Sequence, residues 1–401
     1  MQDDHVGVQI KAWRRRRGGM TQQVLADLAG LSQAYISQIE NGHSTPDRRS
    51  TLVAIAGALN ISVAQLIGAR GNPDDPLLAR ATSHVPAIRA ALVEISAGER
   101  RTRGRDRDTL TSAVAQATSL RNAADYAALA PLLPDLLRDL YAHDGDMAGA
   151  SVEVLFATRY ALKTMGYPDL ALIAARIGVD IAREHGDPVW IGQAVYSLVQ
   201  AFLAESAGLG AQFAASAADE LQASDTRGGQ EVYGCLHILA GYHRAITGQA
   251  QEAVAHLDEA ADVAARLGEP RPYGPLLAGW NGNWFGPTQV EYWRIAVAAE
   301  LGDASTALAV HERLDPTVVP VPNRHVYMET DLARALASAA GEAQDRAAMH
   351  ALARAERAAP QHFRFNPTCR DLVQTLIRRS HRRAVTGSLA DLARKLGLDA
   401  I

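Results

Sequence analysis

Apolar side chains in the first seventy residues recur at helical spacing, in short runs separated by residues that end helices. In the run 32–40, Ile36 and Ile39 fall on one side of a helix turning 100° per residue. Ser32 precedes the run as an N-cap, and the pair Asn41-Gly42 follows it as a stop. The opposite side of this predicted helix is polar or small: Gln33, Ala34, Ser37 and Gln38.

The polar side suits two roles. Glutamine can form two hydrogen bonds with the adenine edge in the major groove of DNA, and serine can contact any base. Uncharged polar groups are equally compatible with a helix face that is only solvated. The pattern of this helix leaves both interpretations open.

The flanking runs favour the first role. The run 21–30 predicts a second short helix, joined to the first by Gly-Leu-Ser with helix-turn-helix spacing. Further helices are predicted before it, after Pro46 and from Ser62, so residues 1–70 form a five-helix domain, here called the head. The head carries eight basic and five acidic residues, a charge of +3, whereas the rest carries 32 and 39, a charge of −7. A basic head on an acidic remainder suits contact with phosphate.

Residues 8–68 resemble the Cro/XRE type of phage-repressor helix-turn-helix domain, through "TQQVLADLAGLSQAYISQIENG" and "TLVAIAGALNIS". The resemblance implies that Gln22 and Gln33 brace one another on DNA and that a helix-1 arginine pairs with Glu40. Gly18-Gly19 makes the first turn one residue longer than usual, which leaves that arginine open among Arg14 to Arg17. The predicted DNA-contacting residues are Arg14, Arg15, Arg16, Arg17, Gln22, Gln33, Ala34, Ser37, Gln38, Asn41 and His43.

Helical periodicity continues through the remainder, residues 71–401, here called the body. We expect a linker and a connecting helix over 71–108 and a helical-repeat domain over 109–401. Phrases of the form Gly-x-x-x-x-Ala begin at Gly166, Gly248 and Gly302, with looser copies at Gly208 and Gly341. Helix pairs at such a period bury their faces by stacking, which predicts an all-α solenoid resembling degenerate tetratricopeptide repeats.

The first helix of each predicted pair carries polar residues beside its packing stripe. On the inner wall of a solenoid they could clamp a peptide or small-molecule effector, although a wet wall without a ligand would look similar. Arg244 is the predicted partner of an acidic group. The predicted effector-binding residues are Gln193, Gln200, Tyr233, His237, Arg244, Gln289 and Tyr292, with Asn281, Asn283 and Trp284 near the mouth.

Signs of other protein classes are weak. The chain has no GxSxG, Walker, GxGxxG or HExxH motif, so we expect neither an enzyme nor a cofactor. Cys235 and His237 are two apart on a helix, which does not suit a metal pair. Cys235 and Cys369, the two cysteines, suit a reducing cytoplasm, and we see no run of 18 apolar residues that would span a membrane.

Together these features predict a cytoplasmic, sequence-specific transcription regulator that binds double-stranded operator DNA as a homodimer held mainly by the body. The stretch from Phe285 to Asp303 resembles a segment of actinobacterial regulators that join such a head to helical repeats. An oligopeptide effector is implied by the resemblance of the architecture to peptide-responsive regulators of Gram-positive bacteria. The alternative is a scaffold whose repeats recruit a protein partner to DNA.

Overall fold

The described part of the chain is built from helices and turns and has no strand. The computed structural model describes residues 6–17, 19–46, 48–61, 63, 66, 75–101, 104–143, 147–270, 283–339, 341–380 and 387–398. The all-α prediction is confirmed, with a helix-turn-helix head followed by stacked helix pairs.

The described helices of the head are α1 (Val6–Arg16), α2 (Gln22–Ala29), α3 (Gln33–Glu40) and α4 (Arg49–Ala58). The Thr21 side chain caps α2 by accepting from the Val24 amide, and Ser32 caps α3 by accepting from the Tyr35 amide. Gly30 ends α2 with a positive φ of 65°, which only glycine adopts without strain. The predictions that Ser32 caps α3, that Gly30 ends α2 and that Asn41-Gly42 ends α3 are therefore confirmed.

The core of the head joins one or two apolar residues from each helix, including Ile10, Leu25, Ile36, Ile39 and Ile55. Ile36 and Ile39 are fully buried, as their spacing predicts. Truncating either to alanine would cost about 2–5 kcal/mol. The fifth helix predicted from Ser62 falls on residues of which only 63 and 66 are described; both are buried.

The body begins earlier than expected. The segment 71–108 contains two described helices, α6 (Pro76–Thr82) and α7 (Val85–Ser96), rather than one connecting helix. Leu78, Ile88 and Leu92 from these helices lie in the same apolar core as the helices that follow. Those following helices are α8 (Arg107–Ala123), α9 (Tyr126–Leu129) with a 3₁₀ turn (Ala130–Leu132), and α10 (Leu133–Tyr141).

Five antiparallel helix pairs follow, as the glycine phrases predict. The turns at Gly166, Gly248, Gly302 and Gly341 have positive φ, whereas Gly208 lies inside a helix. The pairs are α11 (Ala148–Thr164) with α12 (Pro168–His185), α13 (Pro188–Ala201) with α14 (Ala207–Asp219), α15 (Arg227–Ile246) with α16 (Ala250–Leu267), α17 (Pro287–Leu301) with α18 (Ala304–Arg313), and α19 (Pro322–Ala339) with α20 (Glu342–Ala358).

The two ends of the solenoid meet. The Tyr126 hydroxyl lies 2.5 Å from Nδ1 of His362, and Asn323 donates to the Arg121 carbonyl at 2.9 Å. One apolar core joins α6–α12 to α17–α23, and a second joins the helices from α11 to α17. The body is thus closed into a ring of helices rather than left as an open groove.

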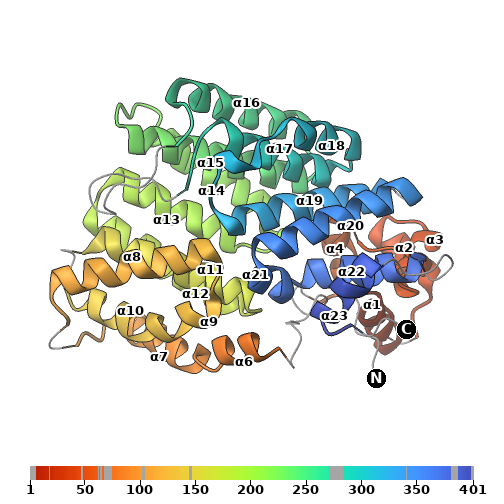
Figure 1. Ribbon diagram of the computed structural model, residues 1–401, viewed down its shortest axis with the longest axis horizontal. Coiled ribbons are helices and arrows are strands. Elements are labelled where there is room, and N and C mark those ends of the chain that lie inside the picture. The colour runs from red at the N-terminus through yellow and green to blue at the C-terminus, as the bar shows by residue number, and fades with distance from the viewer. Residues whose placement is uncertain are drawn as a thin grey trace.

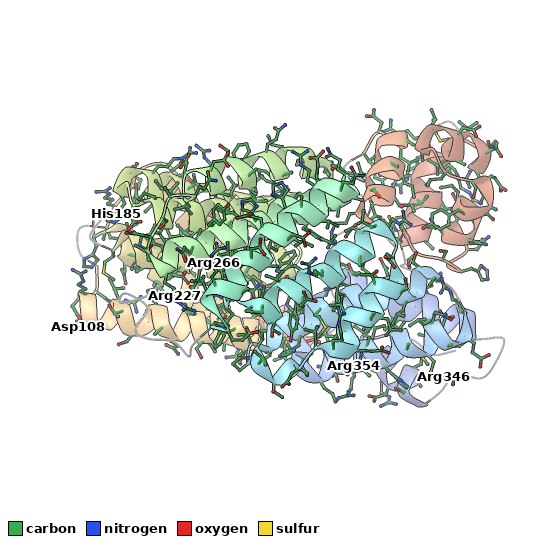
Figure 2. All side chains as sticks on the ribbon, turned by 90° about the horizontal axis from the view of Figure 1, so that it is seen from above. Asp108, His185, Arg227, Arg266, Arg346 and Arg354 are labelled. Atoms are coloured by element: carbon green, nitrogen blue, oxygen red, sulfur yellow. The ribbon has the colours of Figure 1, made fainter. Side chains whose placement is uncertain are left out.

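The chain ends in α21 (Pro360–Phe365), α22 (Pro367–Ser380) and α23 (Gly387–Lys395). Figure 1 shows the head at one end of the molecule, beside α22. Figure 2, seen from above, shows the same head next to the stacked pairs, whose outer helices carry many charged side chains.

Candidate functional site

The outer face of α3 carries the polar side chains that the sequence places there. Gln33, Ala34 and Gln38 are exposed and Ser37 is partly exposed, while Ile36 and Ile39 beneath them are buried. Asn41 at the end of the helix is also exposed. These groups form one continuous surface of hydrogen-bonding and methyl groups.

A chain of hydrogen bonds fixes this face to the rest of the head. Gln33 Nε2 donates to Gln22 Oε1 at 2.9 Å, and Gln22 Nε2 donates to Glu40 Oε2 at 2.8 Å. Arg14 meets both oxygens of the buried Glu40, at 2.6 and 2.8 Å, and these hydrogen bonds raise the pKa of Arg14. The structure thus selects Arg14 as the partner of Glu40, and it brings Gln22 and Gln33 together.

The other basic residues of α1 remain at the surface. Arg15, Arg16 and Arg17 are exposed; the Arg16 guanidinium lies over the Trp13 ring, and Arg17 donates to the Asn60 carbonyl at 2.7 Å. His43 is exposed too, and its carbonyl accepts from Nε of Arg379 on α22 at 3.0 Å. The turn after α3 is therefore held by the body.

The first helices of the pairs line a cavity of about 370 Å³ inside the ring, as predicted for the inner wall. Head residues complete its wall, among them Thr45, Pro46, Arg49 and Leu52. A molecule bound in this cavity would therefore contact both the body and the head.

Gln200, one of the predicted effector-binding residues, lies on the cavity wall between two cations of α11. Its Oε1 accepts from Arg159 Nη2 at 2.8 Å, and its backbone carbonyl accepts from Lys163 Nζ. Burial lowers the pKa of Arg159 to about 10, although the nearby hydroxyls of Tyr327, Tyr160 and Tyr196 act in the opposite direction. Burial, together with the positive charges of Arg159 and Arg49, lowers the pKa of Lys163 to about 7.

Three other predicted residues gather around Arg324 of α19. Asn283 accepts from Arg324 Nη2 through its carbonyl at 3.2 Å and donates from its side chain to Gln193 Oε1 at 2.8 Å. The Gln289 amide, oriented with its oxygen toward Arg324, accepts from Nη1 at 2.8 Å. Gln289 and Arg324 line the cavity, whereas Gln193 and Asn283 are buried outside its lining.

Sequence reasoning missed Lys163 and Arg324. Lys163 is one of only three lysines beside 37 arginines, and it interrupts an apolar helix, which was a usable signal. Tyr292 lines the cavity as expected and its hydroxyl lies 3.2 Å from Nδ1 of His325. Trp284 is buried and does not line the cavity; Asn281 lies outside the described residues.

The prediction of one common groove is wrong for Tyr233, His237 and Arg244. These side chains lie on the face of α15 that packs against α16, away from the cavity. Tyr233 donates to Glu259 at 3.0 Å, His237 contacts His256 at 3.1 Å, and Arg244 pairs with Glu252 at 3.1 Å. A residue beside the packing stripe of a helix can point to the inner wall or to the second helix of its pair. In α15 these three side chains point to the second helix, α16.

Glu300 of α17 connects the two parts of the molecule. Its Oε2 accepts from the Arg49 amide at 2.9 Å, so it caps the first turn of α4 where Arg48 offers no side-chain cap. The Arg49 side chain and Arg334, the latter at 2.7 Å, contact Oε1. Burial alone raises the pKa of Glu300, but Arg334 and Arg49 outweigh burial and lower it below its ordinary value.

Neither a metal centre nor a membrane span is found in the described ranges. No group of three or more His, Cys, Asp or Glu side chains there is placed to hold an ion. Among the described helices, none is long and apolar enough to cross a membrane. Cys235 and Cys369 are free thiols whose burial raises the pKa of each to about 12.

Comparison with known proteins supports the geometry of the head. A helix-turn-helix family matches residues 10–66. The immunity repressor of Bacillus phage phi105 is 46% identical over 63 residues, which are 16% of this chain and 42% of that repressor. The chain therefore spans less than half the length of this relative. A solved structure of Bacillus thuringiensis PlcR in complex with the peptide PapR7 and DNA aligns with 66% of this chain and 95% of PlcR, at 15% identity and a TM-score of 0.31.

Proposed function

We propose that this protein is a cytoplasmic, sequence-specific DNA-binding transcription regulator. Its residues 10–66 form a Cro/XRE-type helix-turn-helix domain. The observation that carries this proposal is the exposed polar face of α3, held on a buried apolar stripe. Gln33, Ala34, Ser37 and Gln38 contact base edges, and the surface arginines of α1 contact phosphates.

The regulator acts as a homodimer held by the body. One head presents a single eight-residue helix to the groove, whereas two heads would read half-sites about 34 Å apart. Sedimentation of the full chain at micromolar concentration tests this point, and a monomer on its own and on DNA contradicts it.

The body is the sensor. An effector, a peptide or small molecule, occupies the ring cavity and touches head residues such as Arg49 and Leu52. It changes DNA binding only if its affinity differs between arrangements of the head. The small volume of the cavity, about 370 Å³, supports this role over a scaffold, because it suits a small ligand better than the folded surface of a protein partner.

Fluorescence anisotropy on DNA selected from a random library tests the DNA-reading role. Gln33→Ala should cost about 1–3 kcal/mol on selected DNA and relax preference at one base pair. Gln23→Ala, an exposed glutamine on α2 that donates to Asp27, is the matched control and should change little. Equal loss on selected and scrambled DNA would remove Gln33 from base recognition.

A further inference from the structure

The wall of the ring cavity carries more positive than negative charge. Its described lining has six basic residues and two acidic ones. The basic residues are Arg48, Arg49, Arg159, Lys163, Arg324 and Arg334, and the acidic ones are Asp331 and Asp371. Carboxylates along this wall pair with Arg49 and Arg334: Glu300 with both, and Asp331 with Arg334 at 2.8 Å.

Three other cations, Arg159, Lys163 and Arg324, contact neutral groups. Arg159 contacts the amide of Gln200 and the rings of Phe156 and Tyr160, at 4.7 and 5.3 Å from their centroids. Lys163 donates to a backbone carbonyl, and Arg324 contacts a backbone carbonyl and the Gln289 amide. Charges taken out of water normally acquire a charged partner, because burial is costly without one.

The two histidines on the wall, His243 and His362, add neither a negative partner nor a further positive charge. Burial, with Lys163 and Arg49 nearby, lowers the pKa of His243 to about 4, and burial lowers that of His362 to about 3. Both imidazoles are therefore neutral near pH 7. For His243 and Lys163 the positive charges nearby add to the effect of burial, so positive charge accumulates on this part of the wall and an anion bound beside it would be stabilised.

The rest of the wall is aromatic. Phe156, Tyr160, Tyr242, Trp293 and Tyr327 line it. Tyr327 keeps 40% of its surface exposed although residues on both sides of it in α19 are buried or half-buried, because it faces the open space of the cavity. Flat apolar surfaces beside a cluster of cations suit a ligand that has a ring system and an acidic group.

We propose that this cavity binds a low-mass organic anion, with its acidic group held by Arg159, Lys163 and Arg324 and its apolar body against the aromatic side chains. The proposal rests on the proposed function, in which the body is the sensor, and it specifies the chemical class of the effector. The volume lies near the lower end of the range for small-molecule sites, which favours such a molecule over an extended peptide.

A matched pair of fluorescent probes tests the charge requirement on the full chain. 8-Anilinonaphthalene-1-sulfonate carries a sulfonate, and N-phenyl-1-naphthylamine has the same rings without it. We expect the sulfonate probe to bind about tenfold more tightly, the size of one charge-assisted hydrogen bond in a water-poor site. Equal affinity of the two probes would overturn the proposal.

Charge-removing variants locate the binding groups. Arg324→Gln and Lys163→Gln should each weaken the sulfonate probe about five- to tenfold and the neutral probe less than twofold. Arg266→Gln, an exposed arginine on the outer helix α16 labelled in Figure 2, is the control and should change neither. Sulfonate binding that falls as much in Arg266→Gln as in the cavity variants would assign it to the surface and overturn the proposal.

A variant that binds neither probe has lost the cavity itself. In that case a competition experiment on the wild-type protein tests the charge requirement. Naphthalene-2-carboxylate should displace the bound neutral probe at about tenfold lower concentration than naphthalene-2-carboxamide, and equal potency counts against the proposal. These measurements do not involve DNA. Their failure leaves the DNA-reading role standing, whereas failure of the Gln33→Ala test removes Gln33 from base recognition and leaves probe binding unaffected.

Discussion

The head and the body place their polar groups on opposite sides of their helices. In the head, apolar residues of α3 point inward and the amides of Gln33 and Gln38 point to solvent. In the body, Arg159 and Gln193 are buried, and polar groups gather on the inner side of the ring. In the proposed function, the polar groups of the head contact a large partner outside it, and those of the body surround the site of a small ligand.

This difference extends to the energetics. An exposed amide on α3 costs little in the free protein, since water solvates it. A buried cation in the ring carries a desolvation penalty in every folded molecule. The body therefore gives up stability for its polar interior, which is common where a site must bind a ligand.

The largest effect should come from Glu300, where the two parts meet. Glu300→Gln removes the charge that caps α4 and that Arg49 and Arg334 share, and leaves the buried Arg334 paired with Asp331, which should lower the free energy of unfolding by about 3–5 kcal/mol. Chemical denaturation with urea measures this change. We expect hydrogen exchange to rise in α4 as well, because the head loses its main polar contact with α17.

A carboxylate on the same helix provides the control. Glu291 pairs with Arg294 at 3.0 Å and is one-third exposed, so Glu291→Gln should cost less than about 1 kcal/mol. Equal losses in the two variants would show that the contact at Glu300 is no stronger than a surface pair. The carboxylate buried between head and body would then stabilise the fold no more than a solvated carboxylate does.

The same contrast explains what the sequence could predict. Ile36 and Ile39 fix which side of α3 is buried, so the outward direction of Gln33 and Gln38 follows from spacing alone. Helix α15 contacts four other helices as well as the cavity, so spacing could not tell that Tyr233, His237 and Arg244 face α16. Ring closure depends on contacts between distant residues such as Tyr126 and His362, for which local periodicity gives no signal.

A smaller effect, with a defined pH dependence, is expected at Lys163. Its pKa of about 7 lies below the ordinary 10.5, so between these values the unfolded chain holds a proton that the folded chain lacks, and stability rises with pH. Below about pH 7 both states are charged and the penalty is complete. Lys163→Met should therefore raise the melting temperature by roughly 2–5 °C at pH 6, with the gain shrinking toward pH 10.

Lys395 gives the opposite case for this measurement. Its hydrogen bond with Glu356, at 2.9 Å, raises its pKa, so Lys395→Met should lower the melting temperature slightly at pH 6. The charges of Arg159 and Arg49 act on Lys163, whereas the neighbouring His243, with its pKa of about 4, is neutral from pH 6 to pH 10. A Lys163→Met protein that melts below wild type at every pH would mean that the lysine stabilises the ring. That result would contradict the view that buried cations lower the stability of the body.

The smallest effect is expected on the basic surface of the head, where the residues that position the head on DNA differ from those that recognise bases. Arg14 is committed to Glu40, which leaves the exposed Arg15 of α1 to contact phosphate. A phosphate contact carries no sequence information, so Arg15→Ala should weaken selected and scrambled DNA alike. It should also reduce the slope of log K against log salt by about 1, the release of one counterion.

Anisotropy titrations at several salt concentrations measure the slope, and Arg266→Ala, the same charge change on the body, should leave it unchanged. A loss confined to selected DNA would instead place Arg15 against a base, and the division between reading and positioning residues in the head would have to be redrawn.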